Sequence, residues 1–97
     1  MKVKNLQGTT NRKCNCKGGW LGHWREFTNC NRTTCCAIGC SNKCEVGAHV
    51  KRELNNESFI VPFCHTHNRK RGEWIEIEDR VPLAPGNKKY SCESGFY

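Results

Sequence analysis

The sequence predicts a small α+β domain that needs more than an apolar core to stay folded. Its 97 residues are 36% hydrophobic and include 9 glycines, and a chain of this size buries little apolar surface. The chain also carries 9 cysteines and 4 histidines. The odd cysteine count, the adjacent Cys35 and Cys36, and histidines at ligand spacing beside cysteines favour metal binding over disulfides. We therefore expect a zinc-stabilised α+β fold.

Two short motifs define the main expected zinc site. Cys36 and Cys40 bracket a tight turn that aims two thiolates at one metal. Cys64 and His67 are three residues apart, so they lie on one face of the first turn of a helix. Three thiolates and one imidazole suit a closed tetrahedral zinc site. A turn from Cys40 to Cys44 is the alternative, but it leaves less chain to enter the following strand.

The stretch between the two motifs predicts a β-hairpin. Residues 45–51 alternate in polarity, which puts the valines on one face and His49 among polar neighbours. Residues 52–58 are a polar turn. Residues 59–61 are the return strand, which we expect Pro62 to stop.

The remaining carboxyl-terminal sequence predicts a helix, a strand and a tail. The helix begins near Cys64 and ends at Gly72, because glycine is common just after helices. Residues 74–78 alternate as a half-buried strand with both isoleucines inward. Residues 79–97 contain two prolines and are expected to wrap the domain as an extended tail.

The amino-terminal part predicts a short amphipathic helix. Trp20, Trp24 and Phe27 recur at positions i, i+4 and i+7, which is the period of one helical face. We expect these rings to turn inward and the helix to end at Asn29. Residues 1–13 show no periodicity and are expected to form a flexible or edge-lying lead-in.

A second zinc site is expected around this helix. Cys14 and Cys16 precede two glycines, which permit a turn sharp enough to bring both thiolates to one metal. His23 lies on the inward helix face, where a metal ligand and a hydrogen-bonded core residue are equally favoured. Cys35 is the candidate fourth ligand, although Cys35 and Cys36 could exchange roles. We therefore expect two zinc ions. Three cysteines keep no assigned role: Cys30, Cys44 and Cys92, the last favoured as a free thiol.

The order of knuckle, hairpin and helix-borne ligands resembles a treble-clef zinc finger. Residues 35–72 are also similar to the HNH group of His-Me finger nucleases, through Ala48-His49-Val50 and Phe63-Cys64-His65-Thr66-His67-Asn68. The resemblance implies that His49 is a general base. It also implies that Asn68 is a ligand of a catalytic Mg²⁺ or Mn²⁺.

Two positions depart from the HNH pattern. Ala48 stands where the family has a metal-binding Asp, and Phe59 stands where it has an Asn. A hard cation prefers oxygen ligands, so we expect cleavage to be absent or very weak. We expect a single zinc-binding domain with four parts: lead-in 1–13, zinc and helix part 14–35, treble-clef core 36–78 and tail 79–97.

The chain is basic, with 16 Lys and Arg against 9 Asp and Glu and a formal charge of +7. This balance suits a polyanionic partner. The candidate nucleic-acid contacts form the densest basic cluster: Lys51, Arg52, Arg69, Lys70 and Arg71. The last three also suit a helix C-terminus without any ligand.

Three functions remain open on these residues. The favoured one is a non-catalytic zinc module that binds nucleic acid or a nucleic-acid-associated protein partner. The alternatives are an HNH-like metal-dependent endonuclease and a protein-binding inhibitor or adaptor. The first residues lack an apolar run and no stretch approaches the length of a membrane span, so we expect an intracellular, cytoplasmic protein.

Overall fold

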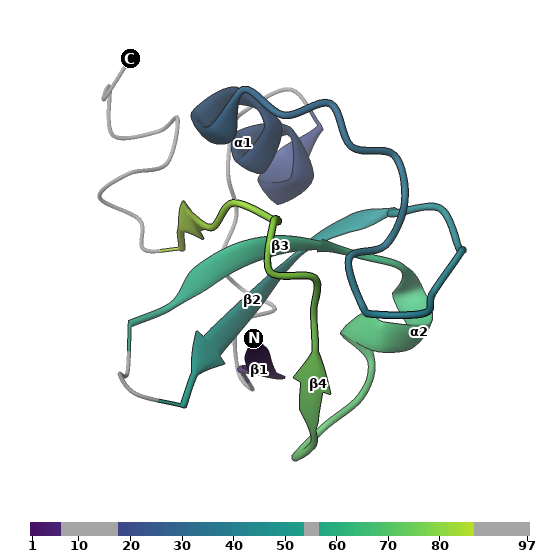
Figure 1. Ribbon diagram of the computed structural model, residues 1–97. Coiled ribbons are helices and arrows are strands. Elements are labelled where there is room, and N and C mark those ends of the chain that lie inside the picture. The colour runs from purple at the N-terminus through teal and green to yellow at the C-terminus, as the bar shows by residue number, and fades with distance from the viewer. Residues whose placement is uncertain (7–17, 54–56, 87–97) are drawn as a thin grey trace.

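The structure is a computed structural model that describes residues 1–6, 18–53 and 57–86. It contains one antiparallel sheet of five strands, in the order β4-β1-β2-β3-β5, and two helices (Figure 1). The elements are β1 (Lys2–Asn5), α1 (Gly19–Thr28), β2 (Val46–Arg52), β3 (Phe59–Phe63), α2 (His65–Asn68), β4 (Trp74–Glu76) and β5 (Ala84–Pro85). The expected α+β class is confirmed.

The hairpin of β2 and β3 sorts side chains onto two faces of the sheet. Ala48 lies opposite Val61, and His49 lies opposite Ile60, and successive residues of a strand point to opposite sides. The side that carries His49 is covered by α1, whose Trp20 ring lies 4.5 Å from the His49 ring between centroids. We call this side the α1 face, and the side of Ala48 and Val61 the α2 face.

Strand β1 holds α2 on the second of these faces. Asn5 lies opposite Val50, so its side chain is on the α2 face. Its amide nitrogen donates to the carbonyl oxygens of His67 at 2.7 Å and Lys70 at 2.9 Å. Carbonyl groups at the end of a helix have no partner within the helix, and here a side chain from a distant strand supplies one.

The interior position of β1 overturns part of the expectation for residues 1–13. β1 is paired with β2 on one side and β4 on the other, and Val3 is fully buried. A four-residue strand with one apolar side chain gives little alternation to detect. The strand forms because it pairs with a neighbouring strand on each side, although its own residues have little preference for β structure. Residues 7–13 lie outside the described part of the chain.

Helix α1 forms as expected and ends at Asn29, which adopts the left-handed conformation with φ 54°. Trp24 is fully buried, and its indole nitrogen donates to the carbonyl oxygen of Pro82 at 2.8 Å. Phe27 is 37% exposed, so the expectation of three inward rings is wrong for this residue. The buried residues of the helix are Leu21, His23 and Trp24, whereas Phe27 lies next to the last residue of the helix.

Pro62 does not stop the return strand, since β3 continues to Phe63. The backbone N–H of Cys36 donates to the carbonyl oxygen of Pro62 at 3.0 Å, on the side away from β2. The N and C=O of one residue point to the same side of a strand. The missing N–H of proline therefore faces away from the β2 ladder, where it removes no sheet bond.

Helix α2 is shorter than the expected helix, because it ends at Asn68 rather than near Gly72. Gly72 has φ 71° and lies in the turn that follows. The Asn5 side-chain amide donates hydrogen bonds to the carbonyl oxygens of His67 and Lys70. These are groups that a longer helix would use for its own hydrogen bonds.

The carboxyl-terminal strand and part of the tail complete the sheet. The expected inward isoleucines are buried, with Ile75 in β4 and Ile77 in an isolated bridge to Ala37. β5 pairs with β3, so the described part of the tail does lie along the domain. Residues 87–97, including Cys92, are outside the described residues.

Candidate metal centre

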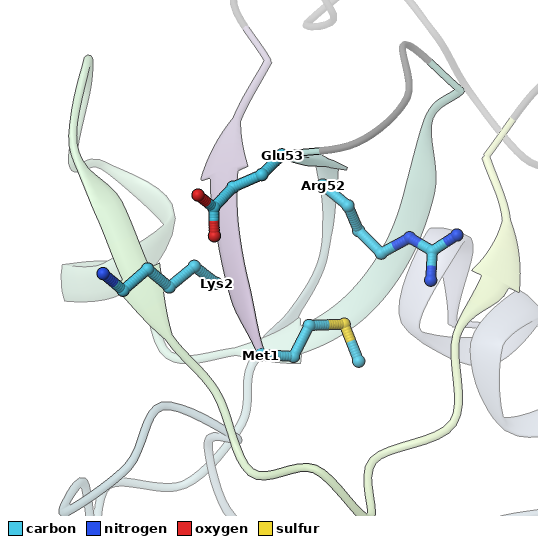
Figure 2. A pocket seen from close by; sticks show the side chains of 4 residues that line it. All are labelled: Met1, Lys2, Arg52 and Glu53. Carbon is cyan, nitrogen blue, oxygen red and sulfur yellow. The ribbon is translucent and has the colours of Figure 1, made fainter.

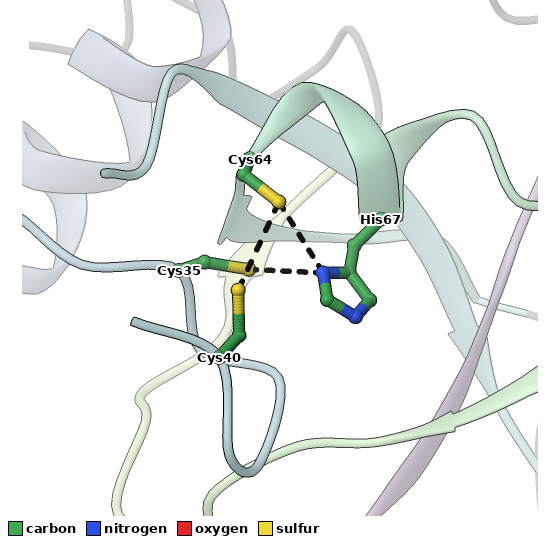
Figure 3. Close-up of side chains that lie close together, drawn as sticks. All are labelled: Cys35, Cys40, Cys64 and His67. Carbon is green, nitrogen blue, oxygen red and sulfur yellow. Dashed lines mark hydrogen bonds between the residues drawn. The ribbon is translucent and has the colours of Figure 1, made fainter. Parts of the chain in front are cut away.

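Three thiols and one imidazole converge at the junction of the 35–40 loop and α2 (Figure 3). The group is Cys35, Cys40, Cys64 and His67, and its ligand atoms all lie within 4.8 Å of one another. The His67 Nδ1 atom lies 3.3 Å from the Cys64 sulfur and 3.6 Å from the Cys35 sulfur. The sulfurs of Cys40 and Cys64 are 4.0 Å apart.

These separations suit a tetrahedral metal. Zinc takes sulfur at about 2.3 Å and nitrogen at about 2.0–2.1 Å, which puts neighbouring ligand atoms of a tetrahedron roughly 3.5–3.8 Å apart. Three thiolates with one imidazole are a common structural zinc set. The group could therefore hold one zinc ion after only small movements of its side chains.

The loop that carries Cys35 and Cys40 is closed by backbone hydrogen bonds. The N–H of Cys35 donates to the carbonyl of Asn42 at 2.8 Å, and the N–H of Cys40 donates to the carbonyl of Ala37 at 3.0 Å. Gly39 has φ 80°, a conformation that favours glycine. These bonds turn the chain sharply enough to bring both sulfurs to one point.

Arg32 fixes the entry to this loop. Its guanidinium forms a two-pronged ion pair with Glu78 and also donates to the carbonyl oxygens of Thr34 and Cys35. The hydrogen bonds from Arg32 lower the pKa of the Glu78 carboxyl. The pair joins the loop to the chain just after β4, so it positions Cys35 without being a member of the Cys/His group.

The other two members of the group come from the start of α2. Cys64 has extended backbone angles immediately before the helix, and its carbonyl accepts from the N–H of Asn68 at 3.0 Å. His67 follows three residues later and packs its ring 5.9 Å from that of Phe63. Asn42 adds a side-chain contact, with its amide nitrogen 3.7 Å from the Cys64 sulfur.

The cysteine thiols of the group differ in acidity. Burial raises the pKa of the Cys35 thiol to about 12. Burial also acts to raise the pKa of Cys64, but the backbone and ring of His67 and the amide of Asn42 outweigh it and lower the pKa to about 6. The two pKa values are shifted in opposite directions, so Cys64 gives up its proton to a metal more readily than Cys35 does.

The structure groups Cys35, rather than the expected Cys36, with the other three residues. Neighbouring residues in extended chain point to opposite sides, so only one of this pair can face the group. Cys36 exchanges backbone hydrogen bonds with Pro62 and Glu78, and its side chain is fully buried in the core. Burial raises the pKa of the Cys36 thiol above its usual range, which keeps it neutral.

The expected amino-terminal zinc site is not assembled from the described residues. Cys14 and Cys16 lie outside them, and Cys35 belongs to the group above. His23 is fully buried, and its Nε2 atom lies 3.0 Å from the carbonyl oxygen of Pro85. Among the remaining described cysteines, the thiol of Cys44 donates to a backbone carbonyl at 3.5 Å.

The two residues expected to act in catalysis are not brought together. His49 is 7% exposed and packs against α1 on the α1 face. Asn68 is the last residue of α2, which the Asn5 hydrogen bonds hold on the α2 face. The sheet lies between these two faces, so the residues do not line one open metal position.

The expected basic cluster is also divided by the sheet. Lys51 and Arg52 are successive residues of β2, so their side chains point to opposite faces. Arg52 lies over the Phe59 ring at 4.9 Å. Arg69 and Arg71 are exposed beside the end of α2, and Lys70 is half-buried.

Comparison of the chain with family models, with curated proteins and with solved structures gives no match. Neither helix of the described residues has the length and apolar character needed to cross a membrane. A fold by itself does not fix an activity, so the metal group and the protein surface are the features that bear on function.

The pKa values predict how zinc affinity depends on pH. Protons compete with zinc for thiolates. Between pH 7 and 8 the Cys35 thiol, with a pKa of about 12, must release a proton. The Cys64 thiol, with its lowered pKa, takes up a proton only at lower pH. We therefore expect zinc affinity to fall about tenfold or more for each unit by which the pH is lowered near neutrality, and more steeply below about pH 6.

Competition with a chelator of known pH dependence, from pH 5 to 8, measures this change. Calorimetry in buffers of different ionisation enthalpy counts the released protons. A zinc affinity that stays constant across this range would show that the thiols are already ionised in the free protein.

Proposed function

We propose that the protein is a non-catalytic zinc module of the treble-clef type that binds nucleic acid. The observation that carries the zinc part is the group of three thiols and one imidazole that joins the 35–40 loop to the start of α2. The order of loop, β2–β3 hairpin and ligand-bearing helix supports the treble-clef assignment.

The composition of the group supports a structural rather than a catalytic metal. Four protein ligands complete a tetrahedron, whereas catalytic zinc keeps one position for water or substrate. Cys35 and Cys64 are buried, and Cys40 and His67 are partly buried. Zinc held in this way would contribute folding energy and leave recognition to the surface.

The charge of the chain supports a polyanionic partner. The formal charge is +7, and phosphate contacts by Lys and Arg supply most of the sequence-independent affinity for nucleic acid. No observation favours the nuclease alternative, because His49 and Asn68 lie on opposite faces of the sheet. The same positive charge would also suit a nucleic-acid-associated protein partner, but net charge by itself does not define a binding site for one.

The test is binding of the zinc-loaded protein to labelled single-stranded DNA, single-stranded RNA and duplex DNA by fluorescence anisotropy over a series of salt concentrations. We expect binding at low salt that weakens linearly in log[salt], since each phosphate contact releases counterions. Protein treated with a chelator should lose this binding together with its fold.

Failure of the zinc-loaded protein to bind any of the three at low salt would favour a protein partner. Plasmid incubated with magnesium or manganese provides the catalytic control. Nicking by the wild type that disappears in His49→Ala would promote the nuclease alternative.

A further inference from the structure

We propose that Trp74, Lys4 and Lys51, which form one row across the sheet, bind single-stranded nucleic acid. We call this row the Trp74 strip. It is on the α1 face of β4, β1 and β2, and it rests on the proposed function, for which it supplies a binding surface. The strip differs from the expected basic cluster, with which it shares only Lys51.

The strand register places the three side chains side by side. Lys4 is paired with Trp74 on one side and with Lys51 on the other. Directly paired residues of antiparallel strands project to the same face, with Cβ atoms about 4.5–5.5 Å apart. Lys51 is two residues from His49, so all three side chains point to the α1 face.

The described helix does not cover this part of the face. α1 packs against β2, β3 and β5, at the other end of the strand order from β4 and β1 (Figure 1). Trp74 is 41% exposed, and it is one of the few large apolar side chains with so much exposed surface in the described structure. The exposed Trp74 ring offers an aromatic face on which a base can stack.

The two lysines of the strip face each other without a carboxylate between them. Like charges directly opposite each other destabilise a sheet. The structure shows no ion pair for Lys4 or Lys51 among its described residues. A phosphate placed between the two ammonium groups would remove their repulsion and gain two charged contacts.

The next row of the sheet provides a contrast. Lys2 lies opposite Glu76 and shares a surface hollow of about 230 Å³ with Glu53. Figure 2 shows the Glu53 side chain extending to the same side as Lys2, while Arg52 extends away. The Glu76 carboxylate pairs with the amino group of Met1, so this row contains carboxylates, whereas the register places no carboxylate directly opposite Lys4 or Lys51.

The tryptophan gives the strip a preference for unpaired bases. The Lys4 ammonium lies 4.6 Å from the centre of the Trp74 ring, so a charge and an aromatic surface are held together. A nucleotide offers the same pairing of phosphate and base. Base faces are available for stacking in single strands and are hidden inside a duplex. We therefore expect single-stranded DNA or RNA to bind better than duplex.

The test compares two double variants that lose the same charge. Lys4→Gln with Lys51→Gln removes the lysines of the strip, and Arg69→Gln with Arg71→Gln removes two exposed cations beside α2. With labelled single-stranded DNA and RNA, we expect the first pair to weaken binding at least about tenfold and to reduce the salt slope by about 1.4. The second pair should change affinity much less.

Substitution of the ring gives an independent test. We expect Trp74→Ala to weaken single-strand binding about tenfold or more and Trp74→Phe to retain most of it, since stacking requires an aromatic face. Zinc content and circular dichroism of every variant confirm the fold.

The outcomes separate this inference from the proposed function. If the wild type binds but the strip variants match the Arg69 and Arg71 variant, the strip is wrong and the proposed function stands. Stronger binding to duplex than to single strands would also overturn the strip. If the wild type binds no nucleic acid at low salt, the proposed function itself fails.

Discussion

Substitution of Cys35 by serine should abolish zinc binding and unfold the protein, whereas substitution of its neighbour Cys36 by alanine should leave the zinc in place. Cys35 belongs to the metal group, and the Cys36 thiol is buried in the core. Structural zinc contributes about 10–16 kcal/mol of apparent binding energy in small zinc domains. A domain of this size has a total stability of only about 5–15 kcal/mol, so loss of the metal removes the folded state.

The two variants make a matched comparison, because both change one buried thiol in adjacent residues. Removing the Cys36 sulfur creates a small cavity and should cost about 1–2 kcal/mol. Metal analysis of purified protein and thermal unfolding with and without chelator provide the readouts. Zinc retained by Cys35→Ser and lost by Cys36→Ala would show that the sequence-based ligand choice is correct after all.

The same metal analysis counts the zinc ions. The described residues account for one ion through the Cys35, Cys40, Cys64 and His67 group. A second equivalent in the wild type would point to the expected site at Cys14, Cys16 and His23. One equivalent in the wild type would remove that site.

Substitution of Gly47 by alanine should destabilise the domain by about 3 kcal/mol or more. A Cβ atom at this position would lie 2.4 Å from the backbone carbon of Trp20 and 2.5 Å from the backbone nitrogen of Leu21. No rotamer change relieves a clash with backbone. Helix α1 would have to move away from β2, which would open the core around Trp24.

Chemical denaturation of the zinc-loaded protein measures this effect. Gly72→Asn is the control, because Gly72 lies outside the 35–40 loop, has φ 71° and has nothing within 4 Å of an added Cβ atom. Asparagine tolerates the left-handed region better than most residues, so the control should cost less than Gly47→Ala, which adds a backbone clash. Equal stability of Gly47→Ala and the wild type would mean that α1 is not seated on β2 as described.

Three members of the metal group could be predicted from sequence because their positions depend on local geometry. Cys64 and His67 need only one helical turn between them, and Cys40 needs only a glycine turn before it. The choice between Cys35 and Cys36 depends on which side of the extended chain faces α2. That direction is set by hydrogen bonds from residue 36 to Pro62 and Glu78, which no spacing rule contains.

The errors in the fold have a similar cause. Strand β1, the passage of β3 through Pro62 and the early end of α2 all depend on partners far away in the sequence. Asn5 is the clearest case, since nothing near it indicates that its amide binds the carbonyls of His67 and Lys70. Helix α1 and the β2–β3 hairpin could be predicted because their own periodicity defines them.

The place of β1 in the sheet sets an order of events during synthesis of the chain. β1 is made early, but its two neighbours are β2 and β4, and β4 begins only at Trp74. The four residues of the metal group all lie between positions 35 and 67, so they are made before β4. β1 can pair with β2 once that strand is made, but its other neighbour becomes available only later. Contacts between distant residues slow folding, so pairing of β1 with β4 is expected to be slower than formation of the β2–β3 hairpin.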